Sequence, residues 1–167
     1  MRKIEKLLLE YKAYHSNEIN TYLHWVGVPV VTFSIFLFLA WFRFIVPEVQ
    51  VSLAMIFFLA STVYYVRLDR QIGLIVFLSF GLLLILAEFA ARLSFSTSIV
   101  IFLACFGLGW VIQFIGHYFE GRRPALLDNI WQVFNAPIFV VCEVMFFFGR
   151  KQELKNALQS GLAKKTT

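Results

Sequence analysis

The sequence has little charge and almost no cysteine. Only 15% of its 167 residues are charged and 60% are hydrophobic, whereas soluble domains are about a quarter charged and about half apolar. This composition argues against a water-soluble globule. The two cysteines, Cys105 and Cys142, lie in apolar runs and provide no disulfide framework. The net charge of +5 is concentrated at the two ends of the chain, and the polar, basic surface that nucleic-acid recognition needs is lacking.

What the chain has instead is a series of long apolar runs. A helix needs about 20 apolar residues to cross a hydrocarbon core about 30 Å thick. Four runs with short connections meet this requirement and predict an all-α, polytopic membrane helical bundle, formed as a single membrane-embedded domain over residues 1–167. Near the end of the third run, Glu88 and Arg92 are expected to pair on one helix face. The four predicted transmembrane helices are residues 25–42, 49–66, 71–91 and 97–116.

A fifth apolar run, residues 130–148, contains Asn135, Pro137 and Glu143, which are costly in a lipid-facing span. With four spans, most basic residues fall on one side of the membrane, and the positive-inside rule makes that side the cytoplasm. We therefore expect the fifth segment to be re-entrant or interfacial from residue 135 to 148. Both termini are then cytoplasmic, in a bacterial inner membrane or the endoplasmic reticulum.

The two ends of the chain have patterns of their own. Apolar residues at helical spacing in the N-terminal arm predict an amphipathic helix lying on the membrane surface. In this arm we interpret Tyr11 and Tyr14 as interfacial anchors. The terminal Lys164-Lys165-Thr166-Thr167 has the form of a dilysine retrieval signal, and we favour a simple basic tail.

The chain has only three histidines: His15, His24 and His117. The first two precede the first predicted span and the third follows the last. An even number of crossings therefore places all three at the cytoplasmic end of the bundle. A single histidine at a membrane boundary is usually an interfacial polar residue, but three at one depth also suit a metal site.

Polar residues accompany the histidines at helical spacing. Asn20 lies four residues before His24, and Gln113, His117 and Glu120 are spaced four and three apart, so each set shares one helix face. Imidazoles can ligate a metal ion, and neighbouring amides and a carboxylate can hydrogen-bond to the ligating rings. The residues predicted to hydrogen-bond to the ligands are Asn17, Asn20 and Gln113.

One geometric condition applies to this site. His15 and His24 are nine residues apart, which puts them about half a turn out of phase on a continuous α-helix. Both can face one ion only if the chain breaks between them. The Ser16-Asn17 pair is the expected place, because both residue types favour turns and helix N-caps.

The ligand set leaves the metal open. Three imidazoles, or two with Glu120, resemble the facial coordination of non-haem Fe(II), which leaves positions for O₂ and substrate. Zinc accepts three histidines and a water. Haem bound by two histidines would leave the third without a role, and a di-iron membrane hydroxylase would need many more histidines than the chain has.

Two blocks of the sequence carry a family pattern. The first is YHSNEIN at residues 14–20 with His24 and Gly27-Val28-Pro29, and the second is QFIGH at residues 113–117 with FEGRRPAL at residues 119–126. Together they resemble the 2-hydroxy-fatty-acid dioxygenase family that acts in phytosphingosine α-oxidation. The resemblance extends over nearly the whole chain, including its apolar runs.

The resemblance implies an Fe(II)-dependent dioxygenase that needs no 2-oxo-acid cosubstrate. Such an enzyme uses O₂ to convert a long-chain 2-hydroxy fatty acid to the fatty acid one carbon shorter. The family's histidines carry over to His15, His24 and His117 as iron ligands. Glu120 is the candidate catalytic residue, as a ligand, as a hydrogen-bond partner of a ligating histidine or as an ion-pair partner of an arginine.

The implied substrate has an acidic head and a tail as apolar as the lipid bilayer around it. Arg122 and Arg123 are candidates to bind its carboxylate, because guanidinium binds carboxylates bidentately; they serve equally well as positive-inside anchors. Glu143 is a further functional candidate as an ionisable residue in an apolar run. Two alternatives stay open: a non-catalytic membrane scaffold or lipid-binding bundle, and a zinc-dependent lipid hydrolase.

Overall fold

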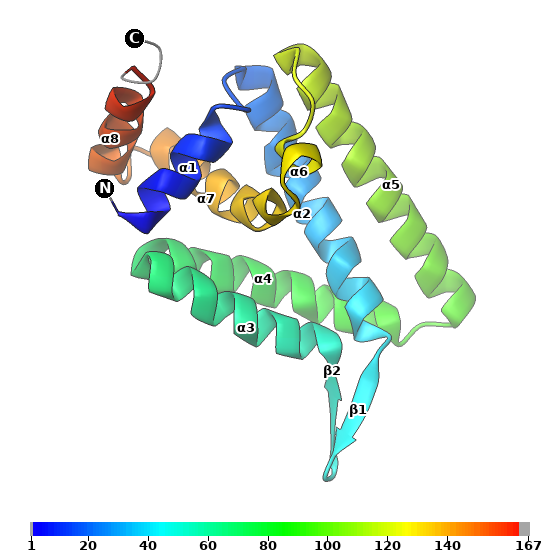
Figure 1. Ribbon diagram of the computed structural model, residues 1–167. Coiled ribbons are helices and arrows are strands. Elements are labelled where there is room, and N and C mark those ends of the chain that lie inside the picture. Colours follow the sequence, from blue (N-terminus) through cyan, green and yellow to red (C-terminus); the bar gives the residue numbers. More distant parts are fainter. Residues whose placement is uncertain (1, 164–167) are drawn as a thin grey trace. The chain divides into compact units, whose positions relative to one another are not determined.

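The protein is almost entirely helical in a computed structural model that describes residues 2–163 (Figure 1). The predicted all-α class is confirmed, and the one sheet in this part of the chain is a two-stranded hairpin. The terminal Lys164-Lys165-Thr166-Thr167 lies outside the described residues. The elements are α1 (Lys3–Lys12), α2 (Glu18–Ala40), β1 (Arg43–Val46), β2 (Val49–Ser52), α3 (Leu53–Leu68), α4 (Arg70–Ala91), α5 (Phe95–Glu120), α6 (Ala125–Asp128), the 3₁₀ helix η1 (Ile130–Phe134), α7 (Asn135–Phe147) and α8 (Gln152–Ala163).

Within residues 2–163, four helical segments are long and apolar enough to cross a membrane: α2, α4, α5 and the run Ile130–Phe147, which comprises η1 and α7. The predicted number of four is confirmed, but the set contains Ile130–Phe147 in place of the span predicted at residues 49–66. Helix α3 has 16 residues, or about 24 Å at 1.5 Å per residue, which is short of a hydrocarbon core of about 30 Å. The re-entrant or interfacial path expected for residues 135–148 stays a prediction.

The hairpin replaces the start of the predicted second span, so the expectation of a helix over residues 49–52 is wrong. Strands β1 and β2 pair antiparallel, with Arg43 opposite Ser52 and Val46 opposite Val49, around a turn at Pro47-Glu48. Proline favours such turns and β-branched residues favour strands. A short apolar run does not by itself distinguish a strand from a helix. For this reason, hydrophobicity alone placed the start of the predicted second span at residue 49, whereas α3 begins at Leu53.

Glu88 is buried against this hairpin. Its carboxylate accepts a hydrogen bond from the Ser52 hydroxyl and forms an ion pair with Arg43, with Nη2 and Oε2 2.7 Å apart. The expected pairing with Arg92 on the same helix is therefore wrong. A buried carboxylate needs such partners because an unpaired buried charge is costly, and the unforeseen hairpin provides them.

The chain divides into two compact units. The terminal unit comprises the residues up to Trp25 and those from Ile112 on, and the central unit is Val26–Val111. By these bounds α2 and α5 each contribute residues to both units. The assignment of residues 1–167 to a single functional domain stays a prediction.

Aromatic packing dominates the central unit. Its helices α3 and α4 lie side by side (Figure 1). The fully buried ring of Phe36 contacts Phe57 and Phe80 at centroid distances of 5.8 and 5.4 Å. Many large apolar side chains of α4 and α5 stay exposed, as expected of helices whose outer faces meet lipid tails.

In the terminal unit, α1 is the expected amphipathic helix, but protein covers its apolar face. Ile4, Leu8 and Leu9 are buried, and α1 packs against α7 and α8 (Figure 1). The sequence interpretation predicted no helix over the residues of α8. The apolar face that suggested a membrane surface therefore has a partner within the chain.

Candidate metal centre

The three histidines lie together in the terminal unit. Their potential ligand atoms are all within 4.8 Å of one another, and their ring centroids are 4.5, 4.9 and 5.1 Å apart. His15 follows α1, His24 lies in the second turn of α2, and His117 lies near the end of α5. All three side chains are buried. Residues far apart in the sequence thus form one cluster of nitrogen donors.

Hydrogen bonds to the backbone define how two of the rings are protonated. Nδ1 of His15 lies 2.9 Å from the Tyr11 carbonyl oxygen, and Nδ1 of His24 lies 2.9 Å from that of Asn20. A carbonyl oxygen only accepts hydrogen bonds, so both Nδ1 atoms carry a proton and both Nε2 atoms present a lone pair. These Nε2 atoms are 3.2 Å apart. Two lone pairs facing each other at this distance suit a shared cation.

His117 is the third donor of the cluster. Its side chain is buried, and its Nδ1 has no hydrogen-bond partner within the described part of the chain. An unpaired polar atom away from water costs free energy. This cost disappears if the ring donates a lone pair to a metal ion, so the donor set fits a metal held by three imidazoles.

The protonation state of His15 also favours metal binding. Burial, with the neighbouring His24 adding to it, lowers the pKa of His15 to about 3. The ring is therefore neutral at physiological pH, and neutral imidazole is the form that ligates metals. A metal ion need not displace a proton from the ring.

The chain breaks between α1 and α2, as the spacing of the first two histidines requires. Residues 13–17 separate the two helices. Asn17 caps α2, because its Oδ1 accepts a hydrogen bond of 2.8 Å from the backbone N–H of Ile19. The predicted break is confirmed, and it allows the first two histidines to face each other.

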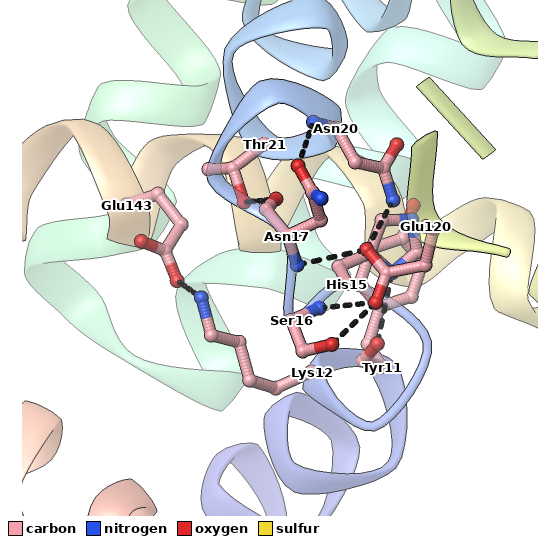
Figure 2. Close-up of polar contacts among 9 residues, drawn as sticks. All are labelled: Tyr11, Lys12, His15, Ser16, Asn17, Asn20, Thr21, Glu120 and Glu143. Carbon is pink, nitrogen blue, oxygen red and sulfur yellow. Dashed lines mark hydrogen bonds and ion pairs between the residues drawn. The ribbon is translucent and has the colours of Figure 1, made fainter. Parts of the chain in front are cut away.

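Glu120, the last residue of α5, holds this turn in place (Figure 2). Its Oε1 accepts hydrogen bonds from the backbone N–H and the hydroxyl of Ser16, at 2.8 and 2.5 Å. Its Oε2 accepts from the backbone N–H of Asn17 at 2.9 Å and from Nδ2 of Asn20 at 3.0 Å. Both carboxylate oxygens are thus engaged, and Glu120 is not part of the histidine cluster. The carboxylate ties the end of α5 to the segment that follows His15.

Comparison with known proteins places the chain in a family. A family model described as "2-hydroxy-palmitic acid dioxygenase Mpo1-like" matches residues 1–148, which include all three histidines. The chain belongs to this Mpo1-like family. One relative, the 2-hydroxy-palmitic acid dioxygenase MPO1 of Saccharomyces cerevisiae, is 34% identical over 159 residues, which cover 91% of this chain and 85% of the yeast protein. No solved structure matches the chain.

In this Mpo1-like protein, the three predicted amide side chains differ in their contacts. Asn20 is fully buried, and its backbone oxygen faces His24. Asn17 caps α2 and donates from Nδ2 to the Phe119 carbonyl oxygen at 3.1 Å. Gln113 is buried one turn before the last histidine, but within the described residues it forms no hydrogen bond with the cluster. Two of the three amides therefore contribute to the turn around the site.

The two arginines already have partners. Nη1 of Arg122 donates to the carbonyl oxygen of Ala13 at 2.9 Å, where a cation also suits the C-terminal end of α1. Arg123 forms an ion pair with Asp128, with Nη2 and Oδ1 2.6 Å apart, and its side chain is 72% exposed. Arg122 is therefore attached to the segment that carries His15, whereas Arg123 is exposed beside its own counter-ion.

The sequence interpretation missed an aromatic enclosure around His15. The interpretation of Tyr11 as an interfacial anchor is wrong: the residue is buried, and its ring stacks on His15 with centroids 4.1 Å apart and planes 5° apart. Burial raises the pKa of the Tyr11 hydroxyl. The spacing of four residues was a usable signal, because such residues share a helix face. Phe139 of α7 contacts both rings, at 4.9 and 5.2 Å, and no sequence pattern links it to the site.

Gly116 is a second residue that the sequence interpretation missed, and it allows α5 to approach Asn20 closely. A Cβ atom at this position would lie 2.4 Å from Asn20 Oδ1, and the amide cannot easily move away because its Nδ2 is bound to Glu120. We expect Gly116→Ala to displace His117 from the other two histidines and to weaken metal binding about tenfold.

Titration of the metal-free protein with Fe(II) measures this effect. Gly107→Ala is the matched control on the same helix, since a Cβ there would meet nothing within 4 Å, and it should bind metal as the wild type does. Equal affinities for both variants would contradict the close approach at Gly116.

Proposed function

We propose that the protein is an Fe(II)-dependent dioxygenase that uses O₂ to convert long-chain 2-hydroxy fatty acids to the fatty acid one carbon shorter. The observation that carries this proposal is the pair of Nε2 lone pairs that face each other at 3.2 Å beside a third buried imidazole. Membership of the Mpo1-like family and the name of the yeast relative support the reaction and the substrate class.

In this proposal His15, His24 and His117 hold the iron. Iron held by these three imidazoles would supply O₂ activation and a Lewis acid for the acidic head of a 2-hydroxy acid. The chain's own contribution is to orient the rings. The backbone oxygens of Tyr11 and Asn20 accept the Nδ1 protons, which maintains the ligating tautomer and increases the basicity of the ligand nitrogens.

The surroundings of the cluster suit a substrate with a polar head and an apolar tail. The rings of Tyr11 and Phe139 cover His15 and exclude water from that side. Exposed apolar side chains also occur close in sequence to the histidines. We propose that the acyl tail lies along this surface at the lipid boundary while the head reaches the histidines. These exposed residues include Ile19, Phe114, Ile115 and Phe119.

Arg122 is the proposed partner of the substrate carboxylate. It is bound to the carbonyl oxygen of Ala13, two residues before His15, and retains further N–H donors for a carboxylate. Arg123 is the second choice, because Asp128 already neutralises it. Glu120 is proposed to act by positioning the turn, since its oxygens are occupied by hydrogen bonds.

We propose that the histidine cluster and both termini face the cytoplasm. The number of crossings between His24 and His117 is then even, so the 16-residue α3 and its neighbour α4 either both cross the membrane or both remain on one side. His24 lies near the start of α2 and His117 near the end of α5, and the basic residues of the N-terminal arm and of the segment after α5 lie beside them in sequence. The positive-inside rule favours the cytoplasm for such segments. A bacterial inner membrane or the endoplasmic reticulum is the proposed location.

Product analysis tests the proposed activity. Detergent-purified protein, loaded anaerobically with Fe(II), receives 2-hydroxypalmitic acid and then O₂. Pentadecanoic acid is expected only when both Fe(II) and O₂ are present, and zinc-loaded protein should yield none. Turnover without O₂ would indicate a hydrolase, and the absence of the shortened acid with iron-loaded protein would contradict the proposal.

A further inference from the structure

Glu143 is an acidic residue within the apolar helix α7 and forms an ion pair with α1. Its Oε1 lies 2.8 Å from Nζ of Lys12 (Figure 2). The two side chains are only 18% and 26% exposed. An ionisable residue in an apolar helix is costly to retain, and neither member of this pair belongs to the histidine cluster.

The ion pair is linked to His15 by two short routes. Along the backbone, the Lys12 carbonyl oxygen accepts a hydrogen bond of 3.0 Å from the His15 N–H. Through the side chains, the Lys12 ammonium lies 5.3 Å from the ring centroid of Phe139, and that ring lies 5.2 Å from His15. Phe139 is one helical turn before Glu143 on α7, so the carboxylate and the ring approach α1 from the same helix face.

We propose that Glu143 is a positioning residue for the metal centre: by holding Lys12 it seats the last turn of α1 on α7 and thereby fixes the ring of His15. This inference rests on the proposed function, because it concerns the same three-histidine site. Tyr11, whose carbonyl oxygen accepts the Nδ1 proton of His15 and whose ring stacks on it, belongs to the same turn. A shift of this turn on α7 therefore moves both supports of the imidazole at once.

The charges explain why a neutral residue would not serve as well. Without the carboxylate, the Lys12 ammonium is left half-buried without its counter-ion, and a lone charge in such a place tends to move towards water. That movement would draw the end of α1 away from Phe139. The outer contacts of a metal site typically change metal affinity 10-fold to 100-fold when they are removed.

The experiment uses the full-length protein in detergent and Co(II) as a spectroscopic probe. The variants are Glu143→Gln and the exchanged pair Lys12→Glu with Glu143→Lys. The matched control is Glu88→Gln, which removes a carboxylate from a similarly short and buried ion pair in the central unit. Co(II) affinity and the visible ligand-field bands report on the metal centre, and thermal unfolding of the metal-free protein reports on the fold.

Glu143→Gln is expected to bind Co(II) about tenfold more weakly, with shifted ligand-field bands. The exchanged pair should recover most of the affinity and the wild-type bands. Glu88→Gln should lower the unfolding temperature and leave the bands unchanged. This difference separates a role at the metal centre from a general effect on stability.

The outcomes that overturn the inference are distinct from those that overturn the function. Wild-type affinity and bands in Glu143→Gln, or equal band shifts in Glu88→Gln, would refute the positioning role while leaving the metal site intact. If Glu143→Gln does not fold, the exchanged pair decides, and bands unlike those of the wild type would count against the proposal. A wild-type protein that binds no metal would refute the proposed function itself.

Discussion

Under the proposed function, a His117→Ala variant is expected to bind no iron and to have no dioxygenase activity. The remaining two imidazoles come from the segment after α1 and from the second turn of α2, and only His117 brings a nitrogen donor from α5 into the cluster. Loss of a residue that hydrogen-bonds to a ligand typically weakens metal binding about 10-fold to 100-fold. Loss of a ligand itself should therefore weaken Fe(II) binding by at least about 100-fold. Iron content after anaerobic purification and conversion of 2-hydroxypalmitic acid measure the two losses.

The neighbouring Tyr118→Ala serves as the control for this variant. Tyr118 is 82% exposed, so its replacement should leave both iron content and activity close to those of the wild type. His15→Ala and His24→Ala should match His117→Ala, because each contributes one of three equivalent donors. Full iron occupancy in any of the three histidine variants would contradict the three-ligand site.

Glu120→Gln is the second substitution with a large expected effect. The carboxylate accepts hydrogen bonds from two backbone N–H groups, a hydroxyl and an amide, whereas a glutamine side chain has one oxygen and an NH₂ group that would face some of these donors. Unsatisfied donors cost about 1–3 kcal/mol each when buried. The turn after His15 should therefore loosen, with Fe(II) affinity falling about 10-fold to 100-fold.

Iron titration and thermal unfolding of the detergent-solubilised protein test this expectation. Glu18→Gln is the appropriate control, because Glu18 is an exposed carboxylate in the first turn of α2. It should bind iron normally. If Glu120→Gln retains wild-type iron affinity, Glu120 has no part in positioning the site.

The fold was predictable where one interaction dominates. Long apolar runs have no stable alternative to helix in a bilayer, so α2, α4 and α5 follow from hydrophobicity. The hairpin at Arg43–Val46 and Val49–Ser52 was not predictable in this way, because strand pairing depends on register between two short segments. The partner of Glu88 was missed for the same reason, since the carboxylate is paired by tertiary contacts and not by helical spacing.

The site was predictable to the extent that it uses local rules. Helical spacing and the nine-residue separation of His15 and His24 required the break at Ser16-Asn17, which the structure contains. Gly116 was not recognised, because a glycine in an apolar helix has many uses and only the close approach of Asn20 reveals this one. Phe139 was hidden among twenty phenylalanines, and only packing distinguishes it from the others.

The origin of the three imidazoles in both halves of the polypeptide has a consequence for biosynthesis. During translation the first two histidines leave the ribosome long before His117 is made, and Phe139, which covers His15, is made later still. A nascent chain that ends before His117 can offer only two of the three proposed ligands. Under the proposed function, we therefore expect iron to bind only after α5 is complete, and a chain truncated before His117 to hold no iron.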